Sequence, residues 1–192
     1  GSGFDLLHPQ IQRWVRQQGW SRLRDVQEQA IAAICGSDQD VLISATTAAG
    51  KTEAAFLPLL GSSAEREQSG ISILYVAPLK ALINDQFRRL EELCDKLELP
   101  LVRWHGDAPQ GPKNKIIKAP AGVVLITPES IEAMLLRRPA TAEALFGALD
   151  SIIIDELHAF LQGPRGLHLS SLLYRIEVLN DRRPRRVGLS AT

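Results

Sequence analysis

A Gly-Lys-Thr triplet at Gly50, Lys51 and Thr52 is the first group of residues whose types and spacing suggest chemistry. It follows the apolar run 41–44 and precedes a helical pattern, and a phosphate-binding loop requires this strand–loop–helix context. Backbone N–H groups at a helix N-terminus attract phosphate. Gly50 would let the backbone come close to the phosphates. Lys51 would reach the β and γ phosphates, and Thr52 would offer its hydroxyl to Mg²⁺. Ala45 stands at the first glycine position of the strict motif, and the alternative is an ordinary loop with a surface lysine.

An acidic pair, Asp155 and Glu156, ends the apolar run 151–155. Carboxylates at the end of a buried strand are suited to a Mg²⁺–nucleotide site. Asp155 would hold Mg²⁺ through water, because this ion keeps much of its hydration shell. Glu156 would orient and deprotonate an attacking water. The alternative is that the pair caps a helix or faces solvent, but the upstream phosphate loop favours the nucleotide site.

The elements that must position these residues follow from an alternation of apolar runs and amphipathic stretches. Continuous runs with β-branched residues indicate strands buried on both faces of a parallel sheet. The strand–helix order predicts an α/β fold with a doubly wound, mainly parallel sheet, after a helical segment at 1–35. Strands are predicted at 41–44, 71–77, 101–104, 122–127, 151–155 and 186–190, helices at 51–60, 81–97 and 129–137, and loops at 61–70, 107–113 and 162–166.

The composition is ordinary for a globular protein, with 45% hydrophobic and 23% charged residues in a chain of 192. No apolar run approaches the ~20 residues of a membrane span, and no signal peptide opens the chain. Cys35 and Cys94 form no disulfide framework, so we expect a reducing compartment, the cytoplasm. With 22 basic and 22 acidic residues the formal charge is zero, which neither supports nor excludes nucleic-acid binding. Residues 1–3 resemble the scar of a cleaved tag.

Five motifs in order resemble those of superfamily 2 helicases of the DEAD/DEAH-related group. Asp-Glu-Leu-His at 155–158 resembles motif II, and Ala-Pro-Leu-Lys-Ala-Leu at 77–82 resembles motif Ia. Thr-Pro-Glu-Ser at 127–130 resembles motif Ib, and Ser-Ala-Thr at 190–192 resembles motif III. Gln27 resembles the Q-motif glutamine that reads the adenine edge. The segments PLKALINDQFRRL, HGD and DELHAFLQGPRGLHLSSLLYRI are similar to the Lhr (large helicase-related) branch, and the likeness covers the chain after residue 3.

The resemblance implies an ATP-driven helicase or translocase built from two RecA-like domains. Residues 4–192 correspond to the first, which is the ATP-binding domain, and the second would belong to the same polypeptide but is missing from this sequence. We expect ATP and Mg²⁺ as cofactors, and a monomeric protein with little turnover by this piece alone. Single-stranded DNA or DNA duplex is favoured over RNA, and no membrane is involved. The alternatives are an RNA helicase, a nucleotide-binding scaffold without turnover, and a P-loop kinase of small molecules.

The resemblance also assigns roles to individual residues. The catalytic group is Lys51, Asp155, Glu156 and His158, and Thr52 and Asp155 would bind Mg²⁺. Coupling of the ATP site to the nucleic acid would involve Ser190, Ala191 and Thr192, together with His158. The nucleotide-binding group is Gln27, Thr47, Ala48, Ala49, Gly50, Lys51, Thr52 and Glu53, and the nucleic-acid group is Pro78, Lys80, Ala81, Gly106, Thr127, Pro128 and Ser130.

Several of these residues also have a plain structural interpretation. Thr127 followed by Pro128 is a typical helix N-cap, and His158 can be a structural histidine whose hydrogen bonds are satisfied. The arginines at 182–186 are either a nucleic-acid patch or a solvated charge run. Lys113, Lys115 and Lys118 could line a strand path, and Trp14 and Trp20 are expected in the core or beside the adenine.

Overall fold

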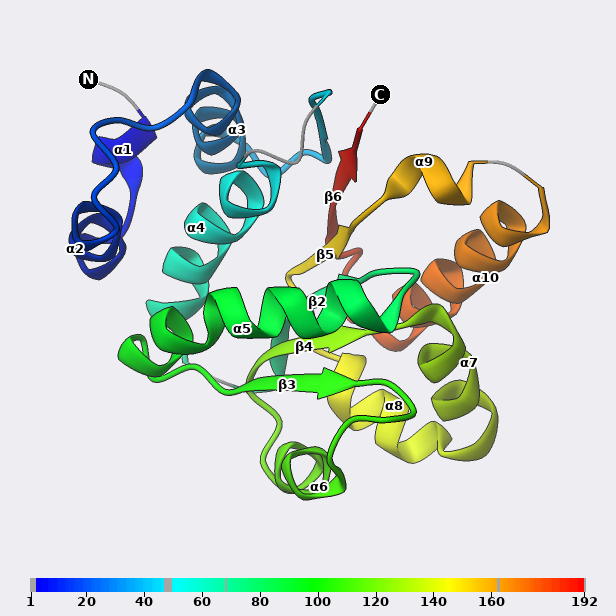
Figure 1. Ribbon diagram of the computed structural model, residues 1–192. Coiled ribbons are helices and arrows are strands. Elements are labelled where there is room, and N and C mark those ends of the chain that lie inside the picture. The colour runs from blue at the N-terminus through cyan, green and yellow to red at the C-terminus, as the bar shows by residue number, and fades with distance from the viewer. Residues whose placement is uncertain (1–2, 47–49, 68, 162, 192) are drawn as a thin grey trace.

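A six-stranded parallel sheet forms the centre of the molecule in the computed structural model, which describes residues 3–46, 50–67, 69–161 and 163–191 (Figure 1). The strand order is β1-β6-β5-β2-β4-β3, and each neighbouring pair is parallel. This confirms the predicted α/β class. The strands are β1 (Val41–Ser44), β2 (Ile71–Val76), β3 (Leu101–Trp104), β4 (Gly122–Ile126), β5 (Ser151–Ile154) and β6 (Arg185–Ser190).

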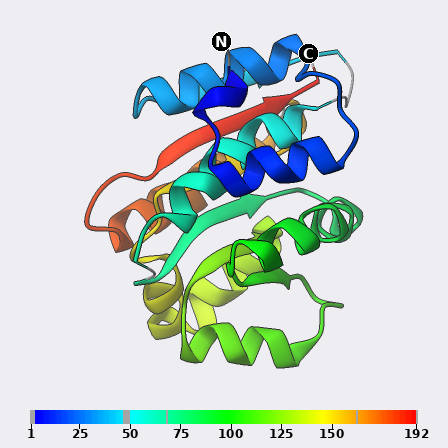
Figure 2. The same ribbon diagram turned by 90° about the vertical axis from the view of Figure 1, so that its left-hand side faces the viewer.

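Helices cover both faces of this sheet, as a parallel sheet requires. The N-terminal helices pack over one face together with α4 and α5, and Figure 2 shows them in blue toward the viewer. The other face is covered by α7, α8 and α10 with part of α6. The helices are α1 (Gly3–Leu6), α2 (Pro9–Gln17), α3 (Asp25–Gly36), α4 (Lys51–Ala64), α5 (Lys80–Lys96), α6 (Gln110–Lys118), α7 (Pro128–Arg137), α8 (Pro139–Phe146), α9 (Leu157–Phe160) and α10 (Pro164–Leu179).

Each face has its own hydrophobic core because successive side chains of a strand point to opposite faces. Tyr75 and Ile153 lie in the core beneath α3, α4 and α5. Val76 and Ile154, one residue further along, lie in the core beneath α7, α8 and α10. The β2 and β5 strands are fully buried, which explains their uninterrupted apolar sequences. No helix within the described ranges is long and apolar enough to cross a membrane.

The predicted strands agree with the structure to within one residue at each end, but three predicted loops were partly wrong. Helix α4 continues to Ala64, because Gly61 permits close contact with His8 rather than ending the helix. Helix α6 begins at Gln110, and Pro112 lies in its first turn, where a missing N–H is tolerated. Helix α10 begins at Pro164, and a Cβ on Gly166 would lie 2.2 Å from the Phe160 carbonyl oxygen.

Candidate functional site

The strand order separates the candidate residues into two groups along the carboxyl edge of the sheet. The candidate nucleotide residues other than Gln27, which is on α3, follow β1, β5 and β6, and these strands are neighbours. The candidate nucleic-acid residues follow β2, β4 and β3, which form the other half. In parallel sheets ligands bind outside the carboxyl ends of the strands. The boundary between the two groups runs between β5 and β2.

The candidate phosphate loop joins β1 to α4. Gly50 immediately precedes α4 with φ +85°, a left-handed conformation that favours glycine. Lys51 is buried, and its Nζ donates to the carbonyl oxygens of Ala45 at 3.0 Å and Ser190 at 3.1 Å. The lysine therefore connects the start of the loop to the end of β6. The predicted loop residues Thr47, Ala48 and Ala49 lie outside the described residues.

Gln27 on α3 contacts the same loop. Its Nε2 donates to the Gly50 carbonyl oxygen at 3.4 Å, while its Oε1 accepts from the Arg24 backbone N–H at 2.9 Å. A cavity of about 400 Å³ opens beside it, lined also by Trp20 and Glu53. Trp20 packs edge-on against the buried Trp14, with ring centroids 5.7 Å apart. The sequence anticipated Gln27 and the tryptophans separately, and the structure brings Gln27 and Trp20 to one cavity.

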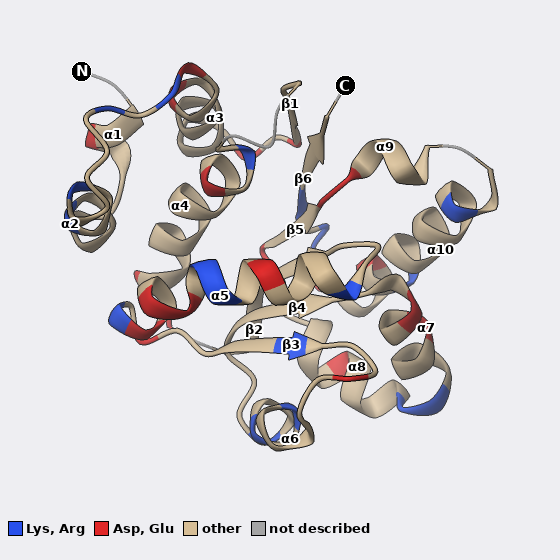
Figure 3. Ribbon diagram, in the orientation of Figure 1, with Lys and Arg blue, Asp and Glu red and all other residues tan. Residues whose placement is uncertain are grey.

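The acidic pair lies where β5 leads into α9, visible as a red stretch in Figure 3. Asp155 is buried, and its Oδ1 accepts from the backbone N–H of Glu156 at 2.8 Å. Its Oδ2 accepts a short hydrogen bond from the hydroxyl of Tyr75, a residue that the sequence motifs did not indicate. Glu156 has φ +52°, a strained backbone for a residue with a side chain, and strain of this kind is concentrated at functional sites.

His158 connects the acidic pair to the end of β6. Its Nε2 lies 2.7 Å from Oε2 of Glu156, and its Nδ1 accepts from the Ala191 backbone N–H at 3.2 Å. Because Nδ1 is an acceptor, Nε2 is the protonated ring nitrogen and donates a hydrogen bond to Oε2 of Glu156. His158 thus contacts one residue of each of the two candidate motifs, II and III. Ser190 contacts Lys51 through its carbonyl oxygen, whereas Thr192 lies outside the described residues.

Thr52 and Asp155 offer one hydroxyl and one carboxylate at the same edge, and hard oxygen donors fit Mg²⁺. No cluster of three or more His, Cys, Asp or Glu ligands occurs among the described residues. Mg²⁺ in nucleotide sites is held by one or two protein ligands together with phosphates and water, so the donor set fits. Thr52 Oγ1 also accepts from Nε2 of the buried Gln86 at 3.5 Å. Glu53 pairs with Arg89 of α5 at 3.4 Å.

The candidate nucleic-acid residues after β2 and β3 lie together. Lys80 is exposed, and its Nζ pairs with Asp107 at 2.8 Å, which lowers the pKa of that carboxyl. A Cβ on Gly106 would lie 3.8 Å from this Nζ. Ala81 is exposed and Pro78 half-buried beside Lys80. An exposed ion pair such as Lys80–Asp107 contributes little to stability, so a phosphate group could replace Asp107 as the partner of Lys80.

Thr127, Pro128 and Ser130 form the start of α7. Thr127 occupies the N-cap position with Pro128 first in the helix, as the capping interpretation predicts. Its buried hydroxyl donates to Ser130 Oγ at 3.0 Å instead of capping a backbone N–H. Ser130 is half-buried and is therefore the more accessible hydroxyl of this motif.

The basic clusters have internal partners. Arg182 pairs with Asp150, Arg183 with Asp40, and Arg186 with Glu177, which supports a charge run over a nucleic-acid patch. Lys113 is buried and donates to the His105 carbonyl oxygen at 2.9 Å, so it does not line a strand path.

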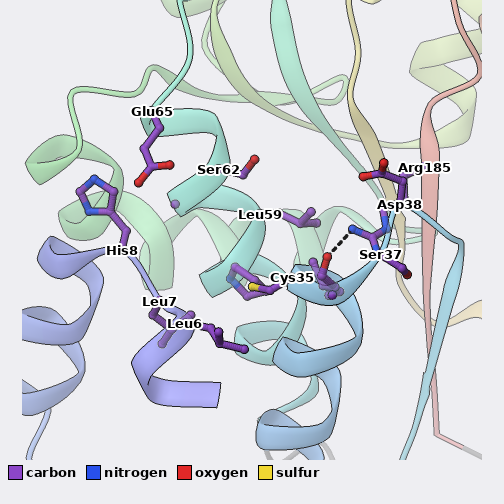
Figure 4. A pocket seen from close by; sticks show the side chains of 14 residues that line it. Leu6, Leu7, His8, Cys35, Ser37, Asp38, Leu59, Ser62, Glu65 and Arg185 are labelled. Carbon is purple, nitrogen blue, oxygen red and sulfur yellow. Dashed lines mark hydrogen bonds between the residues drawn. The ribbon is translucent and has the colours of Figure 1, made fainter. Parts of the chain in front are cut away.

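A cavity of about 480 Å³ lies at the amino end of the sheet, and none of the candidate nucleotide or nucleic-acid residues lines it (Figure 4). Arg185 lines it and donates to the Ile34 carbonyl oxygen at 2.8 Å. Its guanidinium also reaches the carbonyl oxygens of Ala33 and Gln39. Arg185 therefore satisfies carbonyl groups at and after the end of α3.

The parallel sheet with its glycine–lysine–threonine turn and acidic strand end defines a RecA-like P-loop domain. The family profile described as DEAD/DEAH box helicase matches residues 24–192, which is most of the chain. The chain therefore belongs to the DEAD/DEAH box helicase family.

Relatives within the family include Lhr proteins, as the sequence resemblance indicated. The chain is 32% identical to the ATP-dependent helicase Lhr-Core of Methanothermobacter thermautotrophicus, over 100% of this chain and 24% of that protein. It is 33% identical to the Lhr helicase/uracil glycosylase of Escherichia coli, over 83% of this chain and 12% of that protein. The chain thus spans a quarter or less of the length of these relatives.

Solved structures confirm the RecA-like fold. The helicase Lhr of Mycobacterium smegmatis, bound to ssDNA and AMP-PNP, superposes with a TM-score of 0.86 at 30% identity, over 100% of this chain and 26% of that one. The DEAD-box helicase Mss116, bound to ssRNA and UDP-BeF, also has a TM-score of 0.86, at 21% identity, over 97% of this chain and 39% of that one. The second likeness concerns the fold alone.

Proposed function

We propose that the chain is the ATP-binding half of an ATP-dependent nucleic-acid helicase or translocase of the Lhr type. The observation that carries this proposal is the contact of His158 with Glu156 and Ala191, because it links the candidate hydrolytic carboxylate to motif III. Lys51 adds a second link to Ser190. Through these contacts, a change in the bound nucleotide would alter the position of motif III.

In the proposed reaction Lys51 leaves its two carbonyl partners and binds the β and γ phosphates of ATP. Gly50 and the following helix N-terminus contribute backbone N–H groups, with Thr47, Ala48 and Ala49 completing the loop. Gln27 and Glu53 lie beside the cavity that would take the adenine. Glu156 orients the attacking water and accepts its proton. Thr52 and Asp155 would hold Mg²⁺, which supplies positive charge to the phosphates.

Nucleic acid would bind along the β2-β4-β3 half of the edge. Lys80 supplies charge for a phosphate, Gly106 and Ala81 permit close backbone approach, and Ser130 supplies a hydroxyl at the start of α7. These groups contact the backbone, so binding would be independent of sequence. We favour DNA, single-stranded or duplex, because the Lhr relative with 30% identity was solved with ssDNA. RNA is the alternative, since backbone contacts separate the two poorly.

A second RecA-like domain of the same polypeptide would complete the ATP site, and the protein would act as a monomer in the cytoplasm. The free cysteines Cys35 and Cys94 agree with a reducing compartment. This chain spans a quarter or less of the length of the Lhr relatives, so proteins of that length can also contain a second domain.

The experiment that tests this function measures ATP hydrolysis by the intact protein without nucleic acid, with single-stranded DNA and with single-stranded RNA of the same sequence. Stimulation by DNA supports the proposal. Equal or greater stimulation by RNA would favour an RNA helicase. Nucleotide binding without stimulation by either would favour a scaffold, and hydrolysis that is insensitive to Glu156→Gln would contradict the proposed site.

A further inference from the structure

Two buried polar side chains outside the sequence motifs touch the two candidate Mg²⁺ ligands. Gln86 of α5 contacts Thr52, and Tyr75 of β2 contacts Asp155. The contact of Gln86 is long, at 3.5 Å. The contact of Tyr75 is short and joins residues separated by 80 positions in the chain.

Tyr75 has a closely defined environment. It is fully buried, and its ring packs against Phe56 of α4 with centroids 5.5 Å apart. In the sheet it lies opposite Ile153 of β5, two residues before Asp155. Tyr75 and Ile153 point toward the α4 face, and Asp155 follows the same alternation. The hydroxyl is therefore held against the carboxylate by the sheet register and by a ring on the helix that begins with Lys51.

The hydroxyl of Tyr75 is a permanent donor. A phenol keeps its proton at neutral pH, because its ordinary pKa is about 10. A fully buried tyrosine hydroxyl needs a partner, and here the partner is a carboxylate. Charge-assisted hydrogen bonds of this kind are stronger than bonds between neutral groups.

The carboxylate of Asp155 is thereby held at both oxygens. Oδ2 accepts from Tyr75, and Oδ1 accepts from the backbone N–H of Glu156. A carboxylate with one donor on each oxygen cannot rotate freely, yet each oxygen keeps a lone pair for a metal-bound water. Donors behind a metal-binding carboxylate orient it and tune its affinity for the ion.

We propose that Tyr75 is a positioning residue, whose hydroxyl holds the Asp155 carboxylate in the orientation that binds Mg²⁺–nucleotide. This inference rests on the proposed function. Tyr75 touches neither nucleotide nor metal itself, and acts through Asp155. Without the hydroxyl, Oδ2 of a buried carboxylate loses its donor, and the side chain can turn away from the ion.

The test uses Tyr75→Phe, which removes only the hydroxyl, and Tyr174→Phe as its matched control. Tyr174 is the other tyrosine in the sequence and is 65% exposed on α10. Isothermal titration of the intact protein with AMP-PNP, with and without Mg²⁺, measures how much the ion strengthens nucleotide binding. We expect Tyr75→Phe to reduce this enhancement by about tenfold, as for other partners of metal ligands. The affinity of Tyr75→Phe for AMP-PNP without Mg²⁺ should stay within twofold of the wild-type value. Tyr174→Phe should match the wild type with and without Mg²⁺.

Packing is separated from hydrogen bonding by replacing Tyr75 with 4-fluorophenylalanine or with 4-aminophenylalanine. The first fills the space of the hydroxyl without donating, and should lose the Mg²⁺ enhancement even if Tyr75→Phe does not fold. The second donates an N–H from the same place and should restore it. Equal enhancement in the wild type and in both non-donating variants would overturn the role of Tyr75 alone. No Mg²⁺ enhancement in the wild type would overturn the proposed metal site, and this inference with it.

Discussion

At the scale of single residues, Lys51 shows how the start of α4 is connected to the end of β6. Its ammonium is buried and donates to two carbonyl oxygens, one from its own loop and one from the end of β6. A buried ammonium needs such partners. Phosphate oxygens are better partners because they are charged. We therefore expect nucleotide binding to exchange both carbonyl contacts of Lys51 for phosphate contacts.

Lys51→Ala in the intact protein should reduce the rate of ATP hydrolysis by at least about a hundredfold, because the phosphates lose their cation. Lys96→Ala removes an exposed lysine near the end of α5 and should leave hydrolysis unchanged. Steady-state hydrolysis, with circular dichroism to check folding, measures both variants. Hydrolysis by Lys51→Ala at the wild-type rate would show that another group binds the phosphates.

At the scale of elements, the turn after β3 depends on one histidine. His105 is buried, its Nε2 donates to Asn84 Oδ1 at 2.9 Å, and its Nδ1 accepts from the Asp107 backbone N–H at 3.1 Å. Its backbone carbonyl accepts from Lys113. The histidine thereby joins α5, β3 and α6 beside the candidate nucleic-acid residues Lys80 and Gly106.

The free energy of unfolding should fall as the pH is lowered, because of His105. Burial lowers the pKa of His105, so the folded state favours the neutral ring. This stabilisation is complete above about pH 6.5, the usual histidine value, and is lost as the pH falls through the lower pKa of the folded state. Protonation of Nδ1 would also break its hydrogen bond with the Asp107 backbone N–H, because two N–H donors would then face each other. Urea unfolding at several pH values measures this effect. The free energy of unfolding should change less with pH in His105→Gln than in the wild type. An unchanged pH dependence in that variant would contradict this role.

Arg185 joins two other elements, since its guanidinium on β6 reaches carbonyl oxygens of Ala33, Ile34 and Gln39. Arg185→Ala should lower the free energy of unfolding by about 1.5–3 kcal/mol, because charged hydrogen bonds to three carbonyl oxygens are lost. Arg182→Ala is the matched control. The Arg182 side chain is 75% exposed, and its ion pair with Asp150 should contribute less than about 1 kcal/mol. Similar losses in both variants, measured by urea unfolding, would contradict the capping role.

At the scale of the whole molecule, the sheet order places proposed nucleotide chemistry and proposed strand binding side by side on one edge. The two halves meet at β5 and β2, where Tyr75 contacts Asp155. The same β2 strand leads into Pro78 and Lys80. Under the proposed two-domain arrangement, this edge supplies one side of each site, and a second domain supplies the other.

The 192-residue chain alone should therefore bind Mg²⁺–ATP weakly and hydrolyse it at less than about a hundredth of the rate of the intact protein, because half of the transition-state contacts are missing. Parallel assays of the chain and the intact protein at equal concentration, with saturating single-stranded DNA, measure the ratio. Robust turnover by the chain alone would contradict the two-domain account.

Local sequence determined a large part of this molecule. The runs 71–77 and 151–155 contain β2 and β5, because strands buried on both faces need continuous apolar residues. Helices α6, α8 and α10 were not predicted. Glycine and proline near their starts are typical of loops as well as of first turns, and only close packing, as at Gly166, distinguishes the two.

The family, the α/β alternation and the residues of the candidate nucleotide site could be predicted before any fold was known, because each of these depends on short runs of neighbouring residues. The tertiary structure alone decided the strand order, the contact of Tyr75 with Asp155, the partners of the arginines at 182–186 and the role of Lys113. These features join residues that are far apart in the chain, up to 152 positions for Arg185 and Ala33. Such pairs form only when the sheet register and the helix packing bring them together, and no local pattern records that packing.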